Sequence, residues 1–254
     1  MVPSVDFIHL KMKHIPNIIT SLNLVSGFIA IIFAAGGDII SASWLIAAAM
    51  VFDYLDGFSA RLLKAYSALG KELDSLADVV SFGVAPAMII FHLLGGIISP
   101  DTILLLNIDP GKSVIMFLPA IMPVCAALRL AKFNLDASQE TIFKGLPTPA
   151  NAIAVISLIF ALNFSDAAFL KTFAGSALWL LVFTGILSLL MVSSIPLLSL
   201  KIRNFTFRGN EGRYLLVLLI VVCYAIFGLM VLPMIIPLYI IASVVQFYFV
   251  NPKS

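Results

Sequence analysis

The sequence predicts an all-α integral membrane protein, built as a bundle of eight transmembrane helices with a short interfacial helix at the N-terminus. Of its 254 residues, 61% are hydrophobic and 11% are charged, against about 25% charged in an ordinary soluble domain. The apolar residues gather in runs close to the ~20 residues that cross a bilayer as a helix. The basic residues, in turn, collect in alternate connections between these runs.

Eight such runs can be distinguished along the chain. They cover about residues 17–36, 40–63, 77–98, 113–132, 148–164, 174–200, 213–232 and 234–250. Only a tight turn near Pro233 and Pro237 separates the last two, so one broken segment is the alternative there. The first run follows Lys11 and Lys13 as a signal peptide would, but its polar residues favour a retained helix with a working face.

The Lys and Arg residues predict the orientation. One side of this topology receives all of them except Lys112 and Lys171. Because cytoplasmic connections are enriched in Lys and Arg, we expect both termini and the basic connections in the cytoplasm, at a prokaryotic-type inner or plasma membrane. Residues 3–14 mix apolar and basic residues, and either an interfacial helix or a frayed terminus accounts for them.

Carboxylates are scarce, yet five of them lie within one stretch of 26 residues. They are Asp53, Asp56, Glu72, Asp74 and Asp78. Carboxylates near a membrane are costly and repel one another unless cations neutralise them. Oxygen ligands without nearby His or Cys favour hard cations such as Mg²⁺ or Mn²⁺. A metal site is one interpretation of the stretch, and the ion site of a cation-coupled transporter is the other.

Helical spacing favours the metal site. Asp53 and Asp56 are three residues apart, and Asp74 and Asp78 are four apart, so each pair shares one helix face. A turn between the two segments would let antiparallel helices present these pairs to each other. Two metal ions held there would stabilise the attacking and leaving oxygens of a displacement at phosphorus. A transporter would instead predict inverted repeats, which the sequence does not contain.

Eight positions of this stretch form one pattern. In order, they are Asp53, Asp56, Gly57, Ala60, Arg61, Gly70, Asp74 and Asp78. The pattern resembles the signature of the CDP-alcohol phosphatidyltransferase family at every position. That resemblance implies a homodimer and a site open to the cytoplasmic leaflet. It also implies a single membrane domain over 1–254, with a six-helix catalytic core in 15–200 between the interfacial helix of 1–14 and two additional helices in 201–254.

The resemblance further implies roles for these residues. Asp53, Asp56, Asp74 and Asp78 would be the metal ligands, with Asp74 and Asp78 catalytic and Asp78 the general base. The acceptor hydroxyl would attack the lipid phosphate of CDP-diacylglycerol, and CMP would leave. Small residues would line the nucleotide pocket, namely Gly57, Ala60 and Gly70. The guanidinium of Arg61 offers a fork of donors to a phosphate oxygen.

Four flanking segments, covering 15–20, 78–87, 129–134 and 143–150, resemble the membrane-spanning phosphatidylserine synthases within the family. They imply L-serine as the acceptor, with glycerol 3-phosphate or inositol phosphate as the alternative. A serine carboxylate would suit a polar pocket made of Arg129, Lys132, Asn134 and Lys144. Positive-inside anchoring equally accounts for the three basic residues.

Two polar residues near the start of the first run complete the expected site. Asn17 and Thr20 either read the cytosine edge of the nucleotide or cap the first helix. The partners expected for the whole protein are therefore CDP-diacylglycerol, L-serine and membrane lipid, without nucleic acid.

Overall fold

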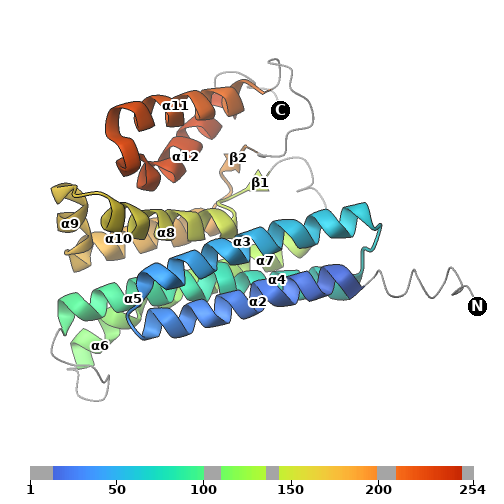
Figure 1. Ribbon diagram of the computed structural model, residues 1–254, viewed down its shortest axis with the longest axis horizontal. Coiled ribbons are helices and arrows are strands. Elements are labelled where there is room, and N and C mark those ends of the chain that lie inside the picture. The colour runs from blue at the N-terminus through green and yellow to red at the C-terminus, as the bar shows by residue number, and fades with distance from the viewer. Residues whose placement is uncertain (1–13, 100–109, 136–142, 199–209, 248–254) are drawn as a thin grey trace, which may run out of the picture.

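A computed structural model describes residues 14–99, 110–135, 143–198 and 210–247, and these are almost entirely helical (Figure 1). The helices are α2 His14–Ala35, α3 Ile39–Leu62, α4 Ala68–Asp78, η1 Val79–Val84, α5 Ala85–Ile98, α6 Pro110–Phe117, η3 Leu118–Ala120, α7 Ile121–Leu135, α8 Thr148–Phe164, α9 Ala168–Ala174, α10 Ala177–Val192, α11 Glu211–Phe227, η5 Gly228–Met234 and α12 Ile235–Val245. Within these ranges there is one pair of strands, β1 Phe143–Lys144 and β2 Pro196–Leu197, which run antiparallel. The helix expected in 1–14 lies outside the described residues, apart from His14.

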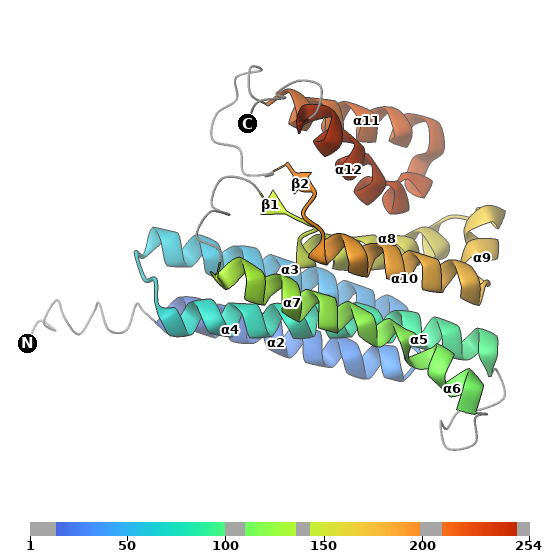
Figure 2. The same cartoon turned by 180° about the vertical axis from the view of Figure 1, so that it is seen from behind.

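The helices are arranged in three tiers (Figures 1 and 2). The long helices α2, α3, α4–α5 and α7 form the largest tier, α8 and α10 lie on it, and the hairpin of α11 and α12 lies beyond them. The strand pair stands at the end of the molecule where α10 ends and α8 begins. In the chain, β1 precedes α8 and β2 follows α10.

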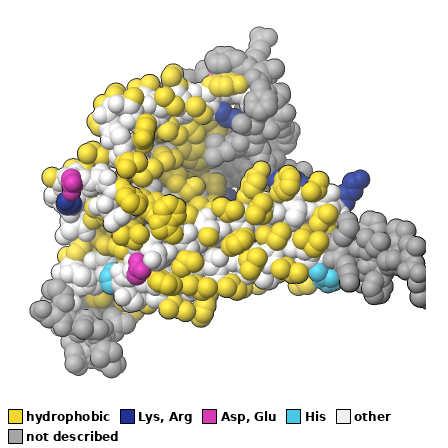
Figure 3. Space-filling model, in the orientation of Figure 1, with side chains coloured by type: hydrophobic (Ala, Val, Ile, Leu, Met, Phe, Trp, Pro, Cys, Tyr) yellow, Lys and Arg dark blue, Asp and Glu magenta, His cyan; other side chains and the backbone are white. Residues whose placement is uncertain are grey.

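Small residues allow α2 and α3 to pack closely. Ala30 and Ala34 are buried on α2, and Ala42 and Ala49 are buried on α3. In a bilayer, apolar side chains gain little by leaving lipid, so close packing of small residues is what holds helices together. Large hydrophobic side chains instead cover the outside of the helices, as Figure 3 shows for one face of the molecule.

The number of membrane spans is smaller than the eight expected. Within the described ranges, five helical segments are long and apolar enough to cross a membrane, or six if the bent pair α9–α10 is one span. The segment Thr148–Phe164 is apolar but short, and Glu211–Val245 counts as one continuous segment. Together with the family assignment given below, these helices identify an integral membrane protein, but eight separate spans are not confirmed.

The third span begins earlier than its hydropathy suggests. We expected it over 77–98, whereas the helical segment runs from Ala68 to Ile98. Its first turns carry polar and charged residues on an exposed face, such as Lys71 and Glu72, which lower the local hydropathy. Glu72 and Asp74, which precede the expected span, therefore lie inside the same long helical segment as Asp78.

The sixth expected span, over 174–200, is also different. The helices α9 and α10 meet at a bend of 82°, and α10 ends at Val192, followed by Ser193 and the β2 strand. The hydropathy of Ile195 to Leu200 extended the prediction too far, because short apolar strands cannot be distinguished from helix by hydropathy alone. The last two expected spans, 213–232 and 234–250, correspond to α11 and α12, which are joined by the 3₁₀ segment η5.

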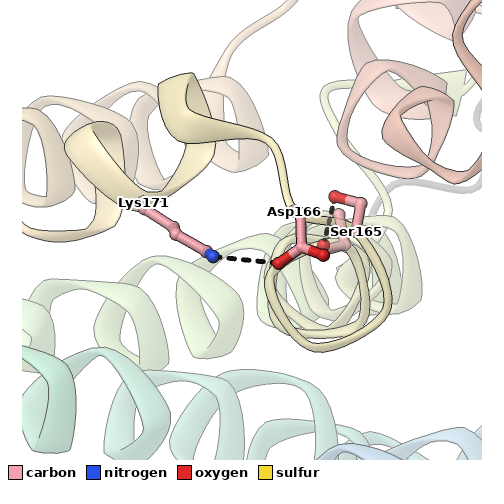
Figure 4. A network of polar contacts seen from close by, with 4 residues as sticks. Ser165, Asp166 and Lys171 are labelled. Carbon is pink, nitrogen blue, oxygen red and sulfur yellow. Dashed lines mark hydrogen bonds and ion pairs between the residues drawn. The ribbon is translucent and has the colours of Figure 1, made fainter.

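The connections between α2 and α3 and between α8 and α9 are short and polar, and they lie away from the acidic stretch of residues 53–78. Asp38 caps α3 by accepting a 2.9 Å hydrogen bond from the Ser41 amide, and this bond lowers the pKa of its carboxyl group. Between α8 and α9, Lys171 and Asp166 form an exposed ion pair with an N···O distance of 3.1 Å (Figure 4). The acidic stretch lies at the other end, where α3 ends and α4 begins.

Candidate metal centre and adjoining pocket

A tight connection brings the two halves of the acidic stretch together. The helix α3 ends at Leu62, and Lys64 adopts a left-handed backbone conformation (φ 49°) that reverses the chain. Ser67 then caps α4, since its hydroxyl accepts a 2.9 Å hydrogen bond from the Gly70 amide. The two helices extend to the same side of this turn and run antiparallel (Figure 1), so their acidic side chains can meet.

Three of the four carboxylates that the sequence predicted as metal ligands converge. One oxygen from each of Asp53, Asp56 and Asp74 lies within 4.8 Å of the others. Asp56 and Asp78 are buried, with 6% and 7% exposure. Among the described residues this group holds three carboxylates, and Asp78, the fourth expected ligand, is not part of it. Carboxylates crowded in this way are unfavourable unless positive charge is supplied.

The chemistry of this group suits a hard divalent cation. All the ligand atoms are carboxylate oxygens, which Mg²⁺ and Mn²⁺ prefer. Oδ1 of Asp74 is buried and has no hydrogen-bond partner among the described residues. A buried oxygen without a partner is costly, and a cation would satisfy it. The residues present therefore fit a metal ion.

Asp78 is oriented from two other helices. Oδ1 lies 3.5 Å from the Asn23 amide nitrogen of α2, and Oδ2 accepts a 3.3 Å hydrogen bond from the Thr148 hydroxyl of α8. Both donors are buried. The carboxylate is therefore held at both oxygens by groups that sequence spacing did not identify.

A π-helical segment follows Asp78 directly. Over Val79–Val84 the helix widens, a distortion that is frequent at functional sites. Ser81 donates a 3.0 Å hydrogen bond to the Asn23 carbonyl, and Asn151 donates a 2.9 Å hydrogen bond to the Phe82 carbonyl. Gly27 makes room for this segment, because a Cβ there would lie 2.7 Å from the Cα of Ser81.

Thr20 supports the carboxylate group from α2. Its hydroxyl lies 2.6 Å from Oδ2 of Asp56 and 3.0 Å from the Pro16 carbonyl, and the shorter contact to the carboxylate is the stronger hydrogen bond. The expectation that Asn17 or Thr20 caps the first helix is wrong. The helix begins at His14, one turn earlier than expected, so both residues lie inside it.

A pocket of about 680 Å³ adjoins the carboxylates. All six residues expected to contact nucleotide or phosphate line it, and they are Asn17, Thr20, Gly57, Ala60, Arg61 and Gly70. Asp56 and Asp74 line the same pocket, which joins the candidate metal centre to it. Gly57 has no neighbouring atom within 4 Å of where a Cβ would be, so this glycine keeps the pocket open.

Comparison with known proteins agrees with this arrangement. A family model described as CDP-alcohol phosphatidyltransferase matches residues 13–191. The chain belongs to the CDP-alcohol phosphatidyltransferase family. This match identifies it as an enzyme. The signature pattern, from Asp53 to Asp78, lies wholly within the matched residues.

Several relatives of this phosphatidyltransferase are named CDP-diacylglycerol–serine O-phosphatidyltransferase. The protein of Helicobacter pylori strain J99 is 31% identical over 244 residues, covering 94% of this chain and 92% of its own length. That of Mycobacterium leprae is 35% identical, covering 74% of this chain and 59% of its own length. That of Bacillus subtilis is 36% identical, covering 60% of this chain and 78% of its own length.

The four residues expected to receive the acceptor do not form one cluster of free side chains. Arg129 of the phosphatidyltransferase is buried, whereas Lys132 is exposed. Asn134 ties α7 to α4, because its amide donates a 2.9 Å hydrogen bond to Ser75 and its carbonyl accepts a 3.3 Å bond from Lys71. The side chain of Lys144 lies outside what the structure describes, although its backbone forms β1.

Four further groups at this site were not expected from the sequence. Tyr66 and Phe133 add aromatic rings to the pocket wall, and Asn23 and Thr148 contact Asp78. Asn23 was detectable, since Asn17, Thr20 and Asn23 recur every three residues along one face of α2. Thr148 comes from a helix 70 residues after Asp78, and no local pattern connects the two.

Proposed function

We propose that this chain transfers the phosphatidyl group of CDP-diacylglycerol to the hydroxyl of L-serine, giving phosphatidylserine and CMP. One observation carries the proposal. Three carboxylates of the family signature, Asp53, Asp56 and Asp74, meet beside one pocket, and the signature positions that are not carboxylates all line that pocket. Serine as the acceptor is supported by the relatives named for it, one of which aligns with 94% of this chain.

The donor is expected in the pocket between α2, α3 and α4. Its diphosphate would lie toward Asp56 and Asp74, which would hold divalent ions together with Asp53 and Asp78, two ions in all. Bound Mg²⁺ or Mn²⁺ would supply the positive charge that stabilises a phosphorus centre under attack and the departing CMP. Arg61 lines the same pocket, and its guanidinium offers further donors to the phosphate oxygens.

Asp78 is the proposed general base. Hydrogen bonds from Asn23 and Thr148 fix its carboxylate, so that it accepts the proton of the acceptor hydroxyl. The acceptor oxygen then forms a bond to the lipid phosphorus, and the bond between that phosphorus and the oxygen of CMP breaks.

Arg129 is the proposed partner of the serine carboxylate. It is buried with 8% exposure, and its Nε has no hydrogen-bond partner among the residues described. The helix α7, which carries Arg129, packs against η1, the segment that directly follows Asp78. A buried guanidinium with unused donors is costly in the free protein and is well suited to a carboxylate ligand.

The orientation in the membrane and the domain division belong to the same proposal. The basic residues near the acidic stretch support a cytoplasmic site and cytoplasmic termini. The apolar helices α8, α11 and α12 support eight spans, with residues 15–200 as the catalytic core. A homodimer remains the expectation from the family.

The test is an acceptor panel with purified enzyme, CDP-diacylglycerol and Mg²⁺ or Mn²⁺. We expect CMP release with L-serine, loss of that release after chelation, and its return when either metal is added back. CMP release with glycerol 3-phosphate or inositol phosphate but not with serine would overturn the acceptor and keep the family chemistry. Release that is unaffected by thorough chelation would remove the metal centre from the proposal.

A further inference from the structure

The C-terminal hairpin lies outside the family-matched residues 13–191, yet it packs against β2 and α8, the helix that carries Thr148. Polar residues on one face of α12 and at its C-cap are buried rather than lipid-facing, namely Tyr239 and Ser243 in the helix and Gln246 at the cap. They recur at intervals of four and three residues, which places them along one helix face. Polar side chains on an otherwise apolar membrane helix are costly and mark a specific contact.

Tyr239 and Ser243 bond both backbone polar groups of Leu198, its carbonyl and its amide. The Tyr239 hydroxyl donates a 2.8 Å hydrogen bond to the Leu198 carbonyl, and the Leu198 amide donates a 3.2 Å bond to the Ser243 hydroxyl. Ser243 in turn donates its own proton to the Tyr239 carbonyl at 2.7 Å. The hairpin thus fixes the backbone of Leu198, which directly follows β2.

From Leu198 a series of backbone contacts leads to the catalytic side chains. The strand β2 pairs with β1, and next to the pair the Gly145 amide donates a 2.9 Å bond to the Ile195 carbonyl. The Leu146 amide likewise bonds the Leu190 carbonyl at 2.9 Å. Gly145 has a φ of +77°, and a Cβ there would lie 2.6 Å from the Met191 carbonyl oxygen. This tightly fitted turn leads into α8.

The first residue of α8 is Thr148, which bonds Asp78. The position of α12 is therefore linked to Asp78, the proposed base, through Leu198, the strand pair and Thr148. The donor pocket, between α2, α3 and α4, has no lining residue from the hairpin.

We propose that Tyr239 and Ser243 are positioning residues for the acceptor: by holding the backbone of Leu198, they fix the acceptor side of the site without contacting the donor. This inference rests on the proposed function for the identity of the acceptor. It makes the C-terminal hairpin a part of the catalytic machinery that lies beyond the family-matched core.

The experiment compares Tyr239→Phe and Ser243→Ala with matched controls in the full-length enzyme. Tyr224→Phe removes an exposed hydroxyl from the same hairpin. Ser165→Ala removes a serine that also donates to the carbonyl four residues earlier, at 2.6 Å (Figure 4), but lies at the C-terminal end of α8, whereas Thr148 is at its start. Each protein is measured for its CMP-binding fraction, its affinity for CMP, and kcat/KM for serine per CMP-binding molecule.

We expect kcat/KM for serine to fall about three- to tenfold in Tyr239→Phe and in Ser243→Ala, the loss that follows from one neutral hydrogen bond. CMP affinity should stay within about twofold of the wild type, and both controls should match the wild type. The double variant should lose less than the product of the two single losses, since both side chains hold the same peptide backbone.

Two results would overturn the inference. One is an unchanged kcat/KM for serine in both variants. The other is a fall only in the CMP-binding fraction, because that is the signature of a side chain that merely stabilises the fold. If the wild type releases CMP with another acceptor instead of serine, the proposed acceptor fails, and the same comparison made with that acceptor still tests the positioning role.

Discussion

Thr20 on α2 donates a 2.6 Å hydrogen bond to Oδ2 of Asp56 on α3, and both side chains are buried. The bond joins the first helix of the bundle to the carboxylate group and uses one of the two oxygens of Asp56. Partners of this kind fix the orientation of a carboxylate before an ion arrives. The first span is thereby part of the candidate metal centre rather than only a membrane anchor.

The first prediction concerns this bond. Replacing Thr20 with Val keeps the shape of the side chain and removes the hydroxyl, so Asp56 loses its fixed orientation. We expect the Mg²⁺ or Mn²⁺ concentration for half-maximal activity to rise about tenfold or more. The measurement is a metal titration of CMP release at saturating substrates.

Two variants serve as controls for Thr20→Val. Thr20→Ser restores a hydroxyl and should recover most of the metal affinity. Thr172→Val removes an exposed hydroxyl that bonds only the Ala168 carbonyl of its own helix, and it should titrate like the wild type. Identical metal titrations for Thr20→Val and the wild type would show that the bond has no part in holding Asp56 for metal binding.

Asp78→Asn tests the general base. The amide keeps the size of the side chain but does not accept the acceptor's proton, so we expect turnover to fall about 10²- to 10⁴-fold. Binding of CDP-diacylglycerol, measured separately, should change little because Asp78 does not line the donor pocket. Asp166→Asn, at the exposed ion pair on the opposite end, is the control, and persisting CMP release in Asp78→Asn would exclude this role.

Much of the fold follows from hydropathy, but its boundaries do not. Long apolar runs such as those in α2 and α3 are recognisable because nearly every residue faces either lipid or another helix. The start of α4 was missed, because a helix at the membrane surface keeps charged residues such as Lys71 on one face. The end of α10 was missed for the opposite reason, since the short strand β2 is as apolar as the helix before it.

The candidate site, too, was predictable from the sequence only in part. Asp53, Asp56 and Asp74 were predictable because helical spacing and one short turn determine that they meet. The contacts of Thr148 with Asp78 and of Tyr239 with Leu198 join segments that are 70 and 41 residues apart. Such contacts depend on how the helices pack, which a single sequence does not specify locally.

Gly57 provides a test that separates the pocket from the fold. A Cβ at Gly57 meets no atom within 4 Å, and the same holds for Gly185 on α10. Gly→Ala in a helix interior is worth about 1 kcal/mol in favour of the helix, so both variants should melt at or slightly above the wild-type temperature in detergent. Only Gly57→Ala narrows the donor pocket, and we expect its KM for CDP-diacylglycerol to rise about tenfold, a loss of ~1.4 kcal/mol in binding.

The outcome for Gly57→Ala is informative in either direction. If its KM for CDP-diacylglycerol matches that of Gly185→Ala, the donor does not approach α3 at this position. A lowered melting temperature in Gly57→Ala alone would instead mean that the glycine serves the fold.

Arg129→Lys tests which basic residue receives the acceptor. Lysine keeps the positive charge but loses the planar fork that pairs with a carboxylate through two hydrogen bonds. We expect the KM for serine to rise about tenfold, equivalent to ~1.4 kcal/mol, while the KM for CDP-diacylglycerol stays the same. Lys132→Met is the comparison, because Lys132 lies three residues further along α7 but is exposed. Steady-state kinetics with both substrates varied separates the two residues, and a raised KM for serine in Lys132→Met but not in Arg129→Lys would assign the carboxylate to the exposed lysine.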